Sequence, residues 1–157
     1  MSRKDEDVLI THIASQHLKD MVLLMLNTGL RLSELLGLSF DEVDLEKRYI
    51  CIRHQLSYKR NEEGEYTFAE TKNKKSRIIP LNKTAYEILD RNIKRRKPEL
   101  GKIYRGKSSI SDDLIFVSSF GDAYNRTGFS SSLGYCIEKK KKSGYEFDCP
   151  RLSAHIF

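Results

Sequence analysis

The stretch Thr28-Gly-Leu-Arg-Leu-Ser-Glu-Leu-Leu-Gly-Leu38 decides the fold, because it predicts a sharp glycine turn followed at once by a short helix. Arg31 stands directly after the turn, and the predicted helix holds residues 31–36 and ends near Gly37. A guanidinium at a helix start adds its planar donors to the free N–H groups there, which suits a phosphate oxygen. The alternative is a surface arginine that pairs with Glu34 one helical turn later. The segment alone leaves both interpretations open.

The flanks of this stretch predict further helical structure. Apolar residues recur at three- and four-residue steps from Leu18 to Leu26, which predicts a helix with one buried face that Gly29 ends. Residues 1–16 have no strong period, and we expect them to be partly loose. On the other side, Ser39 and Glu42 have the spacing of a capping box and predict another short turn.

The centre of the chain predicts a small antiparallel sheet. Residues 49–56 are rich in β-branched side chains and roughly alternate between apolar and polar residues, which predicts a strand. Residues 66–70 predict the returning strand after a turn at 61–64. Residues 77–80 predict a third short strand, which Pro80 closes. The connection between the second and third strands is polar and basic.

Helices dominate the rest, so the predicted class is a mainly helical α+β fold with a three-stranded antiparallel sheet at one edge. Asn82 caps a predicted amphipathic helix that Pro98 stops. The brief apolar run 113–117 predicts a strand, and a further helix ends in the lysines of 139–142. A new helix is predicted to begin at Ser153.

The composition is that of one basic globular domain. The chain has 157 residues, 39% hydrophobic and 32% charged, which is enough apolar material for a core. No apolar run approaches a membrane span and the charged N-terminus lacks a signal peptide's apolar stretch, so we expect a cytoplasmic protein. The three cysteines do not have the spacing of a zinc site, and we expect them to be reduced thiols. The net charge of +6 favours nucleic acid as the partner.

Basic residues gather in the segment Glu70-Thr-Lys-Asn-Lys-Lys-Ser-Arg77, which has four cations in the six positions from Lys72 to Arg77. A basic hairpin tip can lie along a DNA groove, and a lysine there can donate a proton at close range. The alternative is a solvated loop, as most charge runs are. His155, near the end of the chain, is by itself most simply a structural or exposed histidine.

The order of these segments resembles the catalytic domain of the tyrosine recombinases, the family of phage integrases, Xer-type resolvases and conjugative-transposon integrases. The resemblance covers roughly residues 17–157. Residues 28–35 match the family's first-arginine box, and residues 71–81 match its hairpin-lysine segment. Ser153-Ala-His155 matches the start of its His-x-x-Arg box.

The resemblance implies site-specific recombination of double-stranded DNA, with integration or excision of a mobile element as the outcome. A tyrosine attacks the scissile phosphate and forms a 3′-phosphotyrosyl link, which the 5′-hydroxyl of a partner strand then attacks. The implied chemistry uses no metal or nucleotide cofactor. The full-length enzyme would work in a synaptic tetramer with other recombinase protomers.

The same resemblance assigns roles to individual residues. Arg31 would stabilise charge on the phosphate oxygens, Lys72 would protonate the leaving 5′-oxygen, and His155 would bond the phosphate or help move the tyrosine proton. Glu34 would orient Arg31. Contacts to the DNA backbone are expected from Thr71, Lys74, Lys75, Arg77 and Arg126.

The sequence also departs from the family's pattern. The second arginine would follow Phe157, the tyrosine nucleophile would lie further on, and the usual N-terminal DNA-clamping domain is missing. We therefore expect residues 1–157 to be an incomplete catalytic domain that does not cleave DNA alone and exposes apolar surface that favours oligomers. The alternatives are a non-catalytic nucleic-acid-binding or regulatory remnant of an integrase, and an unrelated basic α+β domain.

Overall fold

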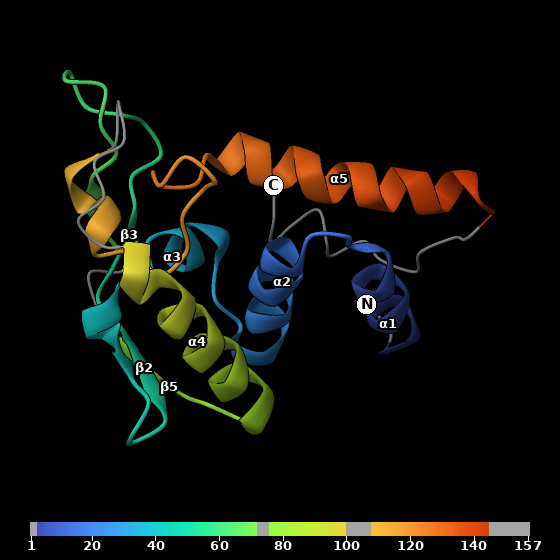
Figure 1. Ribbon diagram of the computed structural model, residues 1–157, viewed down its shortest axis with the longest axis horizontal. Coiled ribbons are helices and arrows are strands. Elements are labelled where there is room, and N and C mark those ends of the chain that lie inside the picture. The colour runs from blue at the N-terminus through green and yellow to red at the C-terminus, as the bar shows by residue number, and fades with distance from the viewer. Residues whose placement is uncertain (1–2, 72–75, 100–107, 145–157) are drawn as a thin grey trace.

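The computed structural model describes residues 3–71, 76–99 and 108–144 (Figure 1). Within these ranges the helices are α1 (Arg3–His12), α2 (Gln16–Thr28), α3 (Leu32–Leu36), α4 (Lys83–Arg96) and α5 (Arg126–Lys142). Short 3₁₀-helices lie at Phe40–Glu42, Lys97–Glu99 and Ser109–Asp112. The strands are β1 (Val43–Asp44), β2 (Tyr49–Ile52), β3 (His54–Leu56), β4 (Phe68–Glu70) and β5 (Arg77–Pro80). The predicted α+β class is confirmed.

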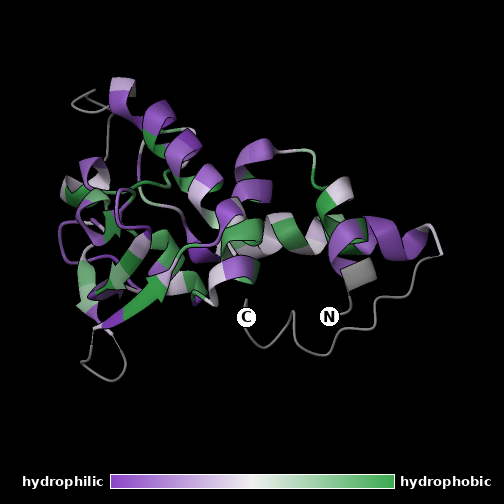
Figure 2. Ribbon diagram, turned by 90° about the horizontal axis from the view of Figure 1, so that it is seen from below, coloured by the Kyte–Doolittle hydropathy of each residue, from purple (hydrophilic) through white to green (hydrophobic). Residues whose placement is uncertain are grey.

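The helices are arranged around α2, with the sheet at one edge. α2 packs against α4 and also contacts α1 and α3, while β2 and β5 lie beside α4 at the lower left of Figure 1. α5 runs along another side and contacts both α3 and α1. Figure 2 shows the far end of α5, which carries Lys139–Lys142, as hydrophilic in contrast to the mixed colours before it.

The strands form two small sheets where the sequence predicts one. β1, β2 and β5 make an antiparallel sheet in the order β1-β2-β5, and β3 pairs with β4 in a separate sheet. The predicted strand 49–56 is therefore split at Arg53, and β4 pairs only with its second half. The buried Glu42 explains the break, because its Oε1 accepts the backbone N–H of Arg53 at 2.6 Å and that of His54 at 3.3 Å. With these donors occupied, the two halves of the strand take different partners.

One hydrophobic core lies between the helices and the three-stranded sheet. It receives Met21 and Leu24 from α2, Leu35 from α3, Ile50 from β2 and Leu89 from α4, each without exposed surface. Complete burial of one such side chain contributes about 1.5–3 kcal/mol relative to exposure. The core therefore holds α3 and β2, which frame the site described below, in a fixed relation.

The prediction that residues 1–16 are partly loose is wrong for the described part of that segment. Residues 3–12 form α1, and Leu9 and Ile13 are 0% and 4% exposed in the core. α1 contacts α2 and α5. Leu9 and Ile13 are the two buried apolar residues of the described part of this segment, and the third buried residue, Asp5, is polar. Two apolar residues are too few to give a detectable period, so tertiary packing rather than pattern stabilises this helix.

Residues 114–117 of the apolar run 113–117 are buried, but the run is not the strand that the sequence predicts. It forms only isolated bridges, one between Ser39 and Leu114 and one between Val117 and Ala123. The buried Arg96 donates from Nε to the carbonyl of Leu114 at 3.1 Å, in place of a partner strand. A buried arginine that donates to a main-chain carbonyl satisfies the hydrogen-bonding capacity of that carbonyl without a neighbouring strand.

The predicted helix boundaries are confirmed. Gly29 ends α2 in the left-handed conformation, with φ 67°, and the Asn82 side chain caps α4 by accepting the N–H of Ala85 at 2.8 Å. The helix predicted at Ser153 lies outside the described residues. Among the helices that the structure describes, none combines the length and the apolar character needed to cross a bilayer.

Gly37 stands where α3 meets β3, and a side chain cannot fit there. A Cβ at this position would lie 2.4 Å from the backbone nitrogen of Leu56. We expect Gly37→Ala to lower the free energy of unfolding by about 1–3 kcal/mol, because backbone atoms must move to accept the methyl group. Urea denaturation followed by circular dichroism measures this.

Gly134, in the middle of α5, is the matched control because a Cβ there meets nothing within 4 Å. Gly134→Ala should leave stability unchanged or raise it by up to about 1 kcal/mol, since alanine is the better helix former. Equal destabilisation by both substitutions would contradict the proposed close approach of α3 to β3.

Candidate active site

Arg31 occupies the N-cap position of α3, directly after the turn at Gly29. Leu30 and Leu32 on either side are 3% and 2% exposed, so they anchor the turn in the core. The Arg31 side chain itself is 55% exposed. The local sequence therefore presents a guanidinium to solvent from a turn whose flanking leucines are buried.

Glu34 lies beneath Arg31 with only 1% of its side chain exposed. Its Oε2 accepts the backbone N–H of Arg31 at 2.8 Å, and its Oε1 accepts from Nη1 of the same arginine at 3.2 Å. The carboxylate thus caps the start of α3 and also pairs with the side chain of Arg31. The pairing with Glu34 that the sequence left as an alternative is present, and the arginine nevertheless stays half exposed.

Arg77, the first residue of β5, completes this cluster. Its Nη1 donates to Oε1 of Glu34 at 2.6 Å and its Nη2 donates to Oε2 at 2.7 Å. Such a two-point arginine–carboxylate pair has strict geometry and is among the stronger hydrogen-bonded pairs in proteins. It joins β5 to α3 across 43 positions of sequence. We call Arg31, Glu34 and Arg77 the arginine–carboxylate cluster.

The cluster keeps Glu34 ionised despite its burial. Burial by itself would raise the pKa of Glu34, but the hydrogen bonds from Arg77 and from the backbone N–H of Arg31 outweigh it. The pKa of Glu34 therefore lies below its ordinary value. A fixed negative charge beneath Arg31 sets the direction of the guanidinium.

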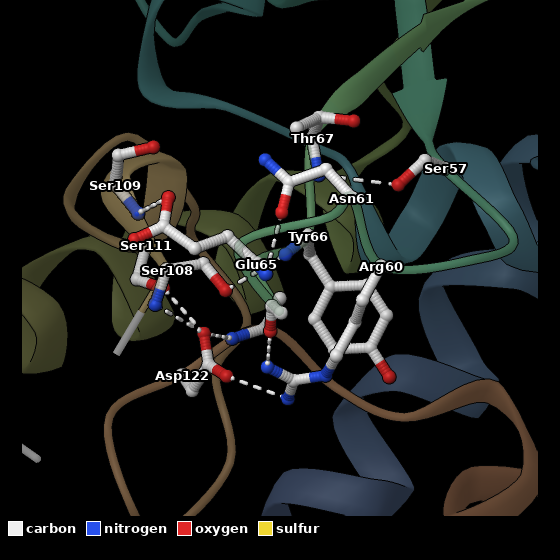
Figure 3. Close-up of polar contacts among 12 residues, drawn as sticks. Ser57, Arg60, Asn61, Glu65, Tyr66, Thr67, Ser108, Ser109, Ser111 and Asp122 are labelled. Carbon is white, nitrogen blue, oxygen red and sulfur yellow. Dashed lines mark hydrogen bonds and ion pairs between the residues drawn. The ribbon is translucent and has the colours of Figure 1, made fainter. Parts of the chain in front are cut away.

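The hairpin of β3 and β4 leads to Thr71, which directly follows β4 and is 6% exposed. Within the hairpin the rings of His54 and Phe68 lie 4.0 Å apart. The hairpin loop is held at its far end by Asp122, as Figure 3 shows. Oδ2 of Asp122 accepts from Nη2 of Arg60 at 3.0 Å, and the Arg60 guanidinium lies 4.2 Å from the centre of the Tyr66 ring.

The other oxygen of Asp122 gathers donors from a neighbouring turn. Oδ1 accepts the backbone N–H groups of Ser108 and Ala123 at 2.9 and 2.8 Å and the hydroxyl of Ser111 at 2.8 Å. Burial would raise the pKa of Asp122, but these bonds lower it below its ordinary value. Asp122 therefore fixes the loop of the hairpin that leads to the basic segment.

Arg126 begins α5, and its guanidinium lies 5.9 Å from the centre of the Tyr58 ring. Both residues line a groove that also includes Ser33 and Gln55, where the Ser33 hydroxyl donates to the Gln55 side chain at 2.9 Å. Because Ser33 belongs to α3, this groove begins beside the helix that Arg31 caps.

The structure thus brings some of the predicted site residues together and separates others. Arg31, Glu34 and Arg77 form one cluster, Thr71 faces the interior, and Arg126 lines the adjoining groove. The remaining predicted residues lie outside the described ranges; they are Lys72, Lys74, Lys75 and His155.

Two features of the site were not predicted from the sequence: the pairing of Arg77 with Glu34 and the role of Asp122. Strand alternation offered a signal for the first, because Arg77 shares a face of β5 with the half-buried Ile79 and therefore points toward the protein. No local pattern identifies Asp122, because its partner Arg60 is 62 positions away.

Comparisons with known proteins agree on one family. Residues 2–157 match the profile described as the phage integrase family. The transposase of transposon Tn916 from Enterococcus faecalis is 36% identical over 138 residues, which are 87% of this chain and 32% of the transposase. The recombinase XerD of Listeria monocytogenes serotype 4b is 28% identical over 109 residues, which are 69% of this chain and 29% of XerD.

Solved structures show the same fold. The Tn1549 transposon integrase in complex with transposon right end DNA superposes with a TM-score of 0.75 at 29% identity, covering 96% of this chain and 47% of that one. The XerA recombinase, at 19% identity, superposes with a TM-score of 0.63 over 95% of this chain and 44% of that one. The fold is that of an integrase-type catalytic domain.

The chain belongs to the phage integrase family, as the motif resemblance indicates. It spans about a third of the length of the curated relatives it matches, 32% for the Tn916 transposase.

Removal of the Asp122 carboxylate should loosen the hairpin. Asp122→Ala removes the acceptor of two backbone N–H groups, of the Ser111 hydroxyl and of Nη2 of Arg60, so we expect a loss of about 2–3 kcal/mol in the free energy of unfolding. The matched control is Asp113→Ala, an exposed carboxylate at the end of the neighbouring 3₁₀-helix, which should cost less than about 0.5 kcal/mol. Thermal and urea denaturation measure both, and similar losses would contradict the proposed role.

The lowered pKa of Glu34 predicts a dependence of stability on pH. A carboxyl whose folded-state pKa lies below its ordinary value of 4.5 contributes stability above that value and loses it as pH falls through the folded pKa. Asp20 and Asp122 share this direction, so the wild-type free energy of unfolding should fall in acid. Glu34→Gln should make the fall shallower below about pH 5. Parallel wild-type and variant curves in urea titrations at several pH values would refute this.

Proposed function

We propose that this chain supplies part of the catalytic domain of a site-specific DNA recombinase that cleaves and rejoins double-stranded DNA through a 3′-phosphotyrosyl link. One observation carries the proposal: a half-exposed arginine stands at a helix start, directly over a buried carboxylate that orients it. Membership of the phage integrase family and the similarity to an integrase described in complex with transposon DNA support it.

Arg31 stabilises the charge that builds on the non-bridging phosphate oxygens during cleavage. Fixed donors aimed at a developing charge contribute more than mobile ones, because they need no reorganisation as the reaction proceeds. The Glu34 carboxylate engages one terminal nitrogen of Arg31, and the exposed remainder of the guanidinium faces the phosphate. In this proposal Lys72 protonates the leaving 5′-oxygen, and His155 bonds the phosphate or helps move the tyrosine proton.

The DNA backbone is contacted by the basic segment and the start of α5. We assign Lys74, Lys75 and Arg126 to phosphate contacts, which position the protein without reading sequence. Thr71 is buried, so any contact it makes to DNA comes from its main chain. The net charge of +6 suits this partner. Other recombinase protomers complete the active assembly, which works in the cytoplasm.

The decisive test separates chemistry from binding. In the complete product of the gene that encodes these residues, Arg31→Ala should lower the rate of covalent protein–DNA formation by about 10²–10³-fold, the usual effect of removing one fixed donor. DNA affinity should fall by less than about tenfold, because many other phosphate contacts remain. Gel analysis of phosphotyrosyl adducts measures the first effect, and fluorescence anisotropy with duplex DNA the second.

The matched control is Lys47→Ala, which removes a cation that is 74% exposed in the turn between β1 and β2. It should leave cleavage unchanged. Equal loss of binding and cleavage by Arg31→Ala would favour the alternative function, a non-catalytic DNA-binding or regulatory remnant of an integrase. Cleavage that is independent of Arg31 would overturn the proposed mechanism.

A further inference from the structure

The arginine–carboxylate cluster contains two cations and one buried anion, and the two cations are not equivalent. Arg77 makes the shorter side-chain bonds to Glu34, at 2.6 and 2.7 Å, while the Nη1 of Arg31 lies at 3.2 Å. Arg77 places both terminal nitrogens of its guanidinium against the carboxylate, whereas Arg31 places one there and is the more exposed side chain, at 55% against 38%. Arg77 is therefore the principal counter-ion of Glu34.

We propose that Arg77 is a positioning residue of the phosphate site: by neutralising Glu34 it leaves the Arg31 guanidinium free to bind a DNA phosphate, without contacting the phosphate itself. This inference rests on the proposed function, because it concerns the same site. It replaces the expectation that Arg77 contacts the DNA backbone.

The physical reason is competition for the buried charge. An ionised carboxylate away from water needs a paired cation, and leaving it unpaired is strongly unfavourable. Without Arg77, the remaining side-chain cation within bonding distance of Glu34 among the described residues is Arg31. Binding of a phosphate by Arg31 would then draw the guanidinium away from an otherwise unpaired carboxylate. Arg77 removes this conflict.

The sheet holds Arg77 in position for this role. Arg77 pairs with Ile52 across the antiparallel ladder of β2 and β5, and Ile52 is completely buried. Two positions further on, Ile79 pairs with the buried Ile50. A one-residue slip would turn both Arg77 and Ile79 to the opposite face, so the register of β5 fixes the counter-ion.

The chain also contains a matched arginine–carboxylate pair away from this site. Arg91 donates to Asp20 from Nε at 3.0 Å and from Nη2 at 2.6 Å, and it joins α4 to α2. Asp20 is as buried as Glu34, with 3% of its side chain exposed. Arg91→Met therefore removes the same kind of bond without touching Arg31, and it measures the purely structural effect of losing such a pair.

The test is DNA binding by the 157-residue chain, measured by fluorescence anisotropy with a duplex of mixed sequence between about 50 and 300 mM salt. Arg31→Met should lower the slope of log affinity against log salt by about 0.9, the value for one lost phosphate contact. Arg77→Met should weaken binding to a similar degree in the wild-type background. In the Arg31→Met background it should have no further effect, because the contact it supports is already absent.

Two further variants distinguish charge competition from loss of structure. Glu34→Gln combined with Arg77→Met removes the buried charge together with its counter-ion, so DNA affinity should recover toward the wild-type value. Arg77→Lys keeps the positive charge but loses the two-point geometry, so its affinity should be intermediate. Arg91→Met should leave the salt slope unchanged, and circular dichroism verifies that each variant is folded.

The outcomes separate the two proposals. An Arg77→Met substitution that lowers the slope by a further 0.9 or so in the Arg31→Met background would make Arg77 a direct phosphate ligand and overturn this inference alone. Failure of the Glu34→Gln and Arg77→Met combination to restore affinity would also overturn it. Absence of DNA binding by the wild-type chain, or a salt slope that does not depend on Arg31, would overturn the proposed function as well.

Discussion

The buried carboxylate of Glu34 is the interaction on which the arrangement of this site depends. It caps α3 through the backbone N–H of Arg31 and receives the guanidinium of Arg77 from β5. An ionised group with 1% exposure is tolerated only if its acceptors are filled, so α3 and the beginning of β5 must meet at this point. The glycine turn before Arg31 and the close packing of Gly37 on β3 are both consequences of placing α3 there.

Buried acids join distant segments elsewhere in the same fold. Glu42 accepts main-chain N–H groups where the long strand breaks, Asp20 joins α2 to α4, and Asp122 joins the hairpin loop to a turn 62 positions away. Glu42 and Asp122 accept main-chain N–H groups, which satisfies irregular backbone without extending a sheet, whereas Asp20 accepts from the side chains of Arg91 and Asn92. A site made of turns and strand ends gains rigidity in this way, and the proposed stabilisation of a phosphate transition state would require such a rigid donor set.

The cluster also reconciles two interpretations of Arg31 that the sequence left open. In the proposed site, pairing with Glu34 and presentation to a phosphate are compatible, because a second arginine also pairs with the carboxylate. Arg77 was predicted as a DNA-backbone contact from the family resemblance, which carries no information about a partner 43 positions away in this chain. The family was predicted from the order of the motifs, and the comparisons confirm the family.

The sequence by itself determined the features that depend on neighbouring residues: the ends of α2 at Gly29 and α4 at Asn82, the helical stretches, the class of fold and the family. Capping and periodicity depend on residues that are close together in the sequence, so they can be recognised from the sequence alone. Only the tertiary structure decided that residues 3–12 form α1, that the sheet divides at Arg53 and that Glu34 meets Arg77. These outcomes depend on burial and on donors and acceptors that folding brings together from distant parts of the chain.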